Sequence, residues 1–169
     1  VLTIDGGGGP FGTVTWHGVG TKLRRISAIA LPNSLGLFYE SSTSHVGLGA
    51  FGEGKFMGLA ACGDPLPCVD RVARLLELPE TSPYRYRKVP KSRTVGFPPR
   101  RDGEDILRPP FPDFAAAVQS RLETVVTRIA SDALTAAGTR VLCAAGGVML
   151  NCSFNGHLAS SGIADRVCV

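Results

Sequence analysis

The fold is decided by the stretch Arg140-Val-Leu-Cys-Ala-Ala-Gly-Gly-Val-Met-Leu-Asn151. The mainly apolar residues 140–145 predict a buried strand, and the two glycines predict a tight turn after it. Residues 148–160 predict a helix, and residues 166–169 begin another strand. A strand, a helix and a strand in this order are typical of an α/β fold.

The long segment before this stretch predicts a helix over residues 113–137. Its apolar side chains recur at steps of three or four, which gives a helix one face for a core. Asp113 is a candidate N-cap, and Gly138 supplies a left-handed stop. Residues 68–78 predict a second, shorter helix.

The first 31 residues predict three short strands separated by glycines, which is typical of an antiparallel meander. Ser34 is a candidate N-cap for a helix that follows. The chain begins with Val1 and ends at Val169 inside a predicted strand. We interpret the chain as an internal segment of a longer protein, with strand edges at both ends that invite association.

Length and charge limit the function. The chain has 169 residues and a net charge of +4, which suits one domain with a core. Residues 84–108 carry +5, so the remainder carries −1 and offers no basic face for nucleic acid. Residues 79–112 hold eight of the twelve prolines and predict an inserted Pro/Arg-rich arm or loop. The longest apolar run, residues 141–150, is too short to cross a membrane.

The five cysteines are odd in number and form no Cys-x-x-Cys pair. This use of cysteine favours a reducing, cytoplasmic compartment over a disulfide framework or a zinc site. The three histidines show no metal-ligand spacing.

One candidate motif follows the first strand, where Asp5 precedes Gly6, Gly7, Gly8 and Gly9. Glycines let an anion approach the backbone N–H groups, and an aspartate there can bind a divalent metal beside a phosphate. A glycine-rich hairpin turn with a solvated aspartate is the alternative.

Two further motifs are candidates for nucleotide contacts. Gly146, Gly147 and Asn151 lie between a strand and a helix, where helix N–H groups favour phosphate or ribose oxygens. Glu53 can accept ribose hydroxyls, and Lys55 can neutralise phosphate. The alternatives are a tight turn with Asn151 bonded to the local backbone, and an exposed ion pair at a helix start.

Taken in order, these pieces resemble the carbamoyltransferase family of nodulation and cephamycin-type antibiotic O-carbamoyltransferases. The resemblance rests on Ser34-Leu-Gly-Leu-Phe-Tyr39, Gly52-Glu-Gly-Lys-Phe-Met-Gly-Leu-Ala60 and Leu142-Cys-Ala-Ala-Gly-Gly-Val-Met-Leu-Asn-Cys152. Asp113-Phe-Ala-Ala-Ala-Val-Gln119 and the Asp5 loop also match. It covers roughly residues 1–78 and 112–169.

The resemblance implies part of one actin-like domain over residues 1–169, with the ribonuclease H-like α/β fold of the sugar kinase, heat-shock and actin superfamily. It also implies transfer of a carbamoyl group from carbamoyladenylate, made from carbamoyl phosphate and ATP, to a hydroxyl of a small molecule. Asp5 would be a metal ligand, with iron(II) as the metal in characterised relatives. Gly6, Gly7 and Gly8 would face phosphate. Glu53, Lys55, Gly146, Gly147 and Asn151 would lie at the nucleotide.

The sequence also departs from the family pattern. The paired metal histidines and a second metal aspartate are absent, and Ala61-Cys62 replaces the usual Pro-Tyr. We therefore expect the segment alone to be inactive. The alternatives are a degenerate nucleotide-binding module without turnover, a relative that modifies tRNA or a protein, and a purely structural role for every glycine motif.

Overall fold

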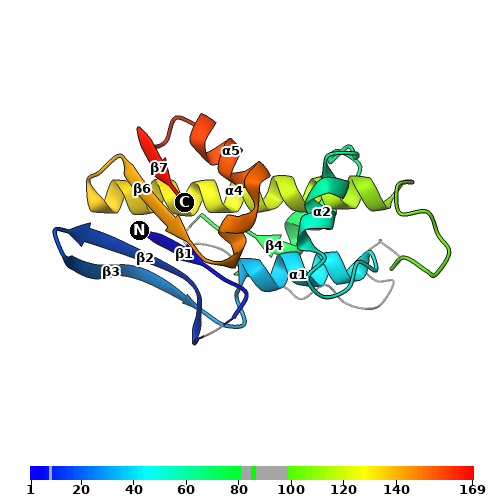
Figure 1. The fold of residues 1–169 in the computed structure, drawn as a ribbon, viewed down its shortest axis with the longest axis horizontal. Coiled ribbons are helices and arrows are strands. Elements are labelled where there is room, and N and C mark those ends of the chain that lie inside the picture. The colour runs from blue at the N-terminus through cyan, green and yellow to red at the C-terminus, as the bar shows by residue number, and fades with distance from the viewer. Residues whose placement is uncertain (8, 81–84, 87–98) are drawn as a thin grey trace. The chain divides into compact units, whose positions relative to one another are not determined.

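The computed structural model describes residues 1–7, 9–80, 85–86 and 99–169. The chain divides into two compact units, one formed by residues 1–37 and 123–169 and the other by residues 38–122. Together they give a mixed α/β fold (Figure 1).

The first unit is built on a five-stranded mixed sheet in the order β3-β2-β1-β6-β7. Its strands are β1 (Leu2–Ile4), β2 (Phe11–Val19), β3 (Lys22–Ala30), β6 (Val141–Ala145) and β7 (Arg166–Cys168). The first three strands form the antiparallel meander that the glycine spacing predicts, which is confirmed. β1 also pairs with β6, and β6 with β7, in parallel. The central strand β1 therefore joins an antiparallel half to a parallel half.

The faces of the sheet differ along β6. Leu142 and Ala144 are buried, whereas Val141, Cys143 and Ala145 are exposed. The strand was predicted to be buried throughout, and this is wrong because one face is open to solvent in the described residues. Its first residue is Val141 and not Arg140.

In the described residues, four α-helices precede β6 in the chain. They are α1 (Leu35–His45), α2 (Glu53–Ala60), α3 (Val69–Leu75) and α4 (Phe111–Ala137). The Ser34 cap of α1 is confirmed, since its hydroxyl accepts a hydrogen bond from the backbone N–H of Leu37 at 3.2 Å. Gly138 has a φ of +61° and ends α4 as expected.

Other predicted boundaries shift. The helix predicted over residues 68–78 ends at Leu75, because Leu76 and Glu77 form β4 (Leu76–Glu77) and pair with β5 (Arg85–Tyr86). Helix α4 begins two residues before Asp113, so Asp113 is not its cap. The Asp113 carboxylate instead accepts a hydrogen bond from the backbone N–H of Asp64 at 2.9 Å.

The helix predicted over residues 148–160 is divided in two. A 3₁₀ turn, η2 (Gly147–Leu150), comes first, and α5 (Cys152–Ser160) follows. Asn151 separates them with an extended backbone. Of the predicted arm over residues 79–112, the structure describes residues 79–80, 85–86 and 99–112, and the rest lies outside the described residues.

The core of the second unit centres on aromatic rings. Phe38, Phe56 and Phe114 are fully or almost fully buried. The Phe56 ring makes edge contacts with Tyr39 at 5.2 Å and with Phe114 at 6.3 Å between centroids. The Tyr39 hydroxyl donates to Oε1 of buried Gln119 at 2.8 Å, which satisfies both polar groups. Within the described residues no helix has the length and apolar character needed to cross a membrane.

Candidate functional site

The candidate site lies in the first unit, where β1 and β6 end side by side. Because the two strands are parallel, their carboxyl ends meet at one edge of the sheet. Ligands of open α/β sheets bind outside this edge. Asp5 follows β1 directly, and Gly146 follows β6.

Asp5 links the two loops through its carboxylate. Its Oδ1 accepts from the backbone N–H of Gly6 at 2.7 Å, and its Oδ2 accepts a longer hydrogen bond from the N–H of Gly147 at 3.4 Å. The side chain stays exposed. Sequence positions 142 residues apart are thus brought together.

The glycines after β6 allow a close approach of backbone to backbone. Gly146 has a φ of +106°, and a Cβ on it would lie 2.8 Å from the carbonyl carbon of Ile4 and nearer still to the oxygen. A Cβ on Gly147 would lie 3.3 Å from Oδ1 of Asp5. A side chain at Gly146 would displace the end of β1, whereas one at Gly147 would require the exposed Asp5 carboxylate to shift by a few tenths of an ångström.

Helix α1 closes the other side of the Asp5 turn. The buried Ser34 hydroxyl donates to the carbonyl oxygens of Asp5 at 2.8 Å and Gly6 at 3.1 Å. Gly36, in the first turn of α1, packs its backbone on Gly6, and a Cβ there would lie 2.8 Å from the carbonyl carbon of Asp5. A helix N-terminus is therefore held against the glycine loop, which is an arrangement that favours anions.

Sequence reasoning predicted the cap at Ser34 but missed its contact with the Asp5 turn. It also missed the close packing of Gly36. The only local signal was a capping residue followed two positions later by a glycine, and such a signal does not identify a partner 29 residues away.

Asn151 has a structural task in this site. Its Oδ1 accepts from the N–H of Phe154 at 2.9 Å and caps α5. Asn155, one turn later, donates from Nδ2 to the carbonyl of Met149 at 2.7 Å and fixes the η2 turn. The site thus holds Asn151 at the start of α5, beside the turn that contains Gly146 and Gly147.

The other predicted site residues lie in the Asp5 loop, outside the described residues or in the second unit. Gly7 belongs to the Asp5 loop, and a Cβ there would meet no atom within 4 Å. Gly8 is outside the described residues. Glu53 and Lys55 lie in the first turn of α2, in the second unit, with Glu53 half-buried and Lys55 exposed.

Asp5 alone does not fit a metal centre. Over residues 1–7, 9–80, 85–86 and 99–169, no three histidine, cysteine, aspartate or glutamate side chains gather as metal ligands would. A divalent ion with hard character needs several oxygen ligands.

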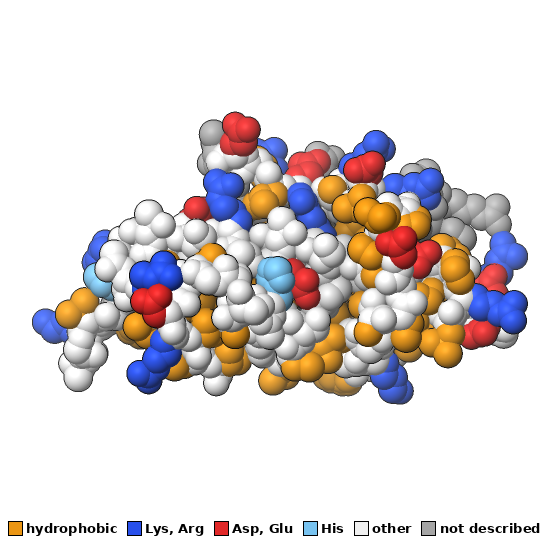
Figure 2. All heavy atoms as spheres, turned by 90° about the horizontal axis from the view of Figure 1, so that it is seen from above, with side chains coloured by type: hydrophobic (Ala, Val, Ile, Leu, Met, Phe, Trp, Pro, Cys, Tyr) orange, Lys and Arg blue, Asp and Glu red, His pale blue; other side chains and the backbone are white. Residues whose placement is uncertain are grey.

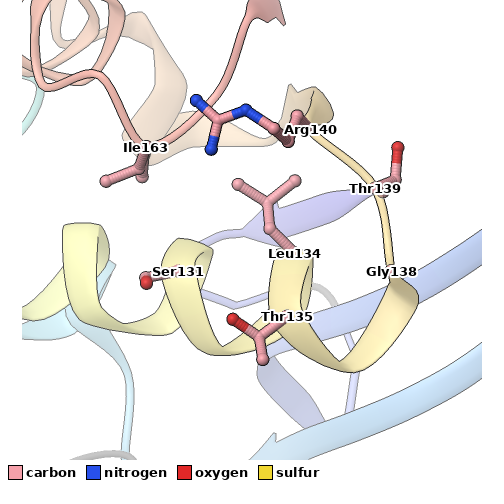
Figure 3. Close-up of a pocket in the computed structure, with 7 residues that line it drawn as sticks. All are labelled: Ser131, Leu134, Thr135, Gly138, Thr139, Arg140 and Ile163. Carbon is pink, nitrogen blue, oxygen red and sulfur yellow. The ribbon is translucent and has the colours of Figure 1, made fainter.

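A pocket of about 390 Å³ lies in the first unit but away from this site. It is lined by residues at the end of α4 and in the connection from α4 to β6, together with Ile163 (Figure 3). The Arg140 guanidinium beside it is bonded to Asp165 at 2.6 Å and to the carbonyl of Gly162 at 2.9 Å. The pocket is therefore at the opposite end of β6 from Gly146.

The surface drawn in Figure 2 shows basic and acidic side chains interspersed on one face of the molecule. Among the described residues, Arg128 and Asp132 form one exposed ion pair, at 2.9 Å. Exposed pairs of this kind contribute little to stability.

Comparison with known proteins places the chain. It is 34% identical to the nodulation protein NolO of Bradyrhizobium diazoefficiens over the whole chain, which spans 31% of that protein. It is 33% identical to the nodulation protein NolNO of Sinorhizobium fredii, of which it spans 25%. An uncharacterized protein of Synechocystis is 35% identical over 96% of the chain. Residues 1–169 match the family described as Carbamoyltransferase N-terminus. The chain belongs to the carbamoyltransferase family, within its N-terminal domain.

Proposed function

We propose that the chain is the nucleotide-holding part of an O-carbamoyltransferase with an actin-like, ribonuclease H-like fold. The observation that carries the proposal is the convergence of the Asp5 turn, the Gly146–Gly147 turn and the N-terminus of α1 at one edge of the sheet. The sheet order, a meander followed by two parallel strands, supports the actin-like assignment.

Each part of this edge has a defined chemical task in the proposal. The open space around Gly7 lets a phosphate approach the backbone, and the N-terminus of α1 stabilises its charge. The turn at Gly146 and Gly147 receives the adenosine, with its shape fixed by Asn151 at the start of α5. Glu53 and Lys55 lie in the second unit, so their expected roles in ribose and phosphate recognition stay predictions from the sequence.

The reaction proposed for the longer protein is acyl transfer. A hydroxyl of a small-molecule acceptor attacks the carbamoyl carbon of a carbamoyladenylate made from carbamoyl phosphate and ATP, and AMP leaves. Backbone donors placed where negative charge develops would stabilise the transition state. Asp5 could supply one ligand to a divalent metal such as iron(II), but one carboxylate does not make the site. No step is therefore assigned to a metal.

Nucleotide titration with matched alanine variants tests the proposal. We expect the chain to bind ATP and AMP, measured by isothermal titration calorimetry. Gly147→Ala should weaken binding, because the new methyl group would lie 3.3 Å from Oδ1 of Asp5 and move that carboxylate by a few tenths of an ångström. Gly156→Ala is the matched control, since nothing lies within 4 Å of its added Cβ, and it should bind as the parent does.

The outcomes separate the alternatives. Equal affinity in both variants, or no nucleotide binding by the parent chain, would overturn the assignment and favour a structural role for these turns. Binding by the full-length protein without release of AMP from carbamoyladenylate in the presence of hydroxyl acceptors would indicate a degenerate module.

A further inference from the structure

Two cysteines lie directly opposite each other on the parallel strands β6 and β7. The register pairs Cys143 with Cys168, and the strands run side by side in Figure 1. Cys143 is exposed and Cys168 is half-buried, and both are free thiols. Opposed residues of neighbouring strands point to the same face of a sheet, so both thiols lie on the face that β6 leaves open.

The distance between neighbouring strands decides what this pair can do. Strands in a sheet lie about 4.8 Å apart, so like rotamers put the two sulfurs at about that separation. A disulfide needs Cβ atoms only about 3.8 Å apart, which would draw the strands together. Two metal–thiolate bonds of about 2.3 Å, end to end, span about 4.6 Å. The spacing therefore suits an ion held between the sulfurs better than a sulfur–sulfur bond.

The ligand set decides which kind of ion fits. Thiolates are soft ligands that select copper(I), zinc and iron–sulfur clusters, and such clusters are commonly held by four cysteines. In the described part of the chain no third histidine, cysteine or carboxylate joins the pair to make a metal-binding group. Zinc sites of the structural kind use four ligands, so two thiolates do not meet that requirement.

We propose that Cys143 and Cys168 form a two-coordinate site for a soft monovalent ion of the copper(I) type. On binding, each thiol releases its proton to solvent and each sulfur donates an electron pair to the ion. Two neutral thiols and one monovalent cation thus become a bis-thiolate complex with one negative charge and two free protons. Affinity rises with pH for the same reason. The site does not depend on the proposed nucleotide function.

Competition for copper(I) tests the site. The whole chain, reduced and kept under argon, is titrated against the copper(I) chelator bicinchoninate. We expect one ion per chain, and a loss of affinity of more than about 100-fold in Cys143→Ser and in Cys168→Ser. Cys152→Ser and Cys62→Ser are matched controls, since both side chains are exposed cysteines outside the pair, and they should bind as the parent does.

A second measurement keeps the test independent of the serine variants. In the parent chain, bound copper(I) should protect Cys143 and Cys168 from alkylation by iodoacetamide, while Cys62 and Cys152 stay reactive, as read by peptide mass spectrometry. Circular dichroism confirms that each variant is folded.

Three results would overturn the proposal. The first is equal loss of affinity in the control variants. The second is copper(I) affinity in the parent no higher than in Cys143→Ser. The third is failure to bind copper(I) together with ready formation of a Cys143–Cys168 disulfide in glutathione disulfide, which would make the pair a redox couple.

Discussion

Replacing Gly36 by alanine should separate helix α1 from the Asp5 turn. The added Cβ would lie 2.8 Å from the carbonyl carbon of Asp5 and closer still to the N and Cα atoms of Gly6, whereas ordinary contact begins at 3.4 Å. Every nearby atom belongs to backbone, so no flexible side chain can move aside. The turn or the helix must shift by at least about 0.6 Å.

The expected cost follows from three contributions. Overpacking of this kind costs about 1–3 kcal/mol. The same shift weakens the hydrogen bond that the single Ser34 hydroxyl proton shares between Asp5 and Gly6, which contributes about 1 kcal/mol in all. Alanine returns about 1 kcal/mol through its helix propensity. We expect a net destabilisation of about 1–3 kcal/mol and loss of nucleotide binding.

Urea denaturation followed by circular dichroism measures this difference. Gly58→Ala in α2 is the control, because it is also a helical glycine but its added Cβ would meet nothing within 4 Å. The control should be stabilised by about 0.5–1 kcal/mol. If Gly36→Ala were as stable as Gly58→Ala, the close packing of α1 on the Asp5 turn would be refuted.

Three further predictions concern other parts of the chain. Gly138→Ala should cost about 1–2 kcal/mol in urea denaturation, since the residue ends α4 with a φ of +61°, and an unchanged midpoint would contradict this. Arg100→Lys should destabilise the chain by about 1 kcal/mol, because Nε donates to the carbonyl of Val46 at 2.8 Å and lysine lacks the guanidinium fork; parent-like denaturation would exclude that role. Burial, with smaller effects from nearby charges, raises the pKa of Cys68 from 9.0 to about 11. The thiol of the unfolded chain loses its proton at a lower pH than the folded one, so the free energy of unfolding should fall as pH rises from 9 to 11. Cys68→Ala should flatten this pH dependence, whereas Cys62→Ala should leave it unchanged.

The sequence patterns predict the local elements well because those elements depend on neighbours in the chain. The meander over residues 1–31 follows from glycine punctuation, and α4 follows from apolar steps of three or four. The end of α3 does not follow, because Leu76 pairs with Tyr86 across ten positions of sequence. A local pattern contains no information on such a partner.

In the candidate site, too, local sequence predicts some residues and not the contacts that depend on distant partners. Glycines and an acid that follow strands predict Asp5, Gly146 and Gly147 as site residues, and the structure brings these three residues together. The predicted contacts with nucleotide and metal remain predictions. Asn151 was chosen for an adenosine contact, and its side-chain oxygen is engaged in capping α5. The bond from Ser34 to the Asp5 turn depends on tertiary packing, which the periodicity of a sequence does not encode.

Gly36 and Gly146 pack directly against the backbone of the Asp5 turn and of β1. These contacts between backbones fix the distances between α1, β1 and β6. Neither position has room for a methyl group, so a side chain at either one would force α1, β1 and β6 apart at a cost in stability. Gly7 and Gly9, by contrast, face open space. Changes in ligand preference would therefore come from this outer part of the Asp5 loop, while the distances between α1, β1 and β6 stay the same. A designer who wishes to alter ligand preference should vary positions 7 and 9 and leave the frame untouched.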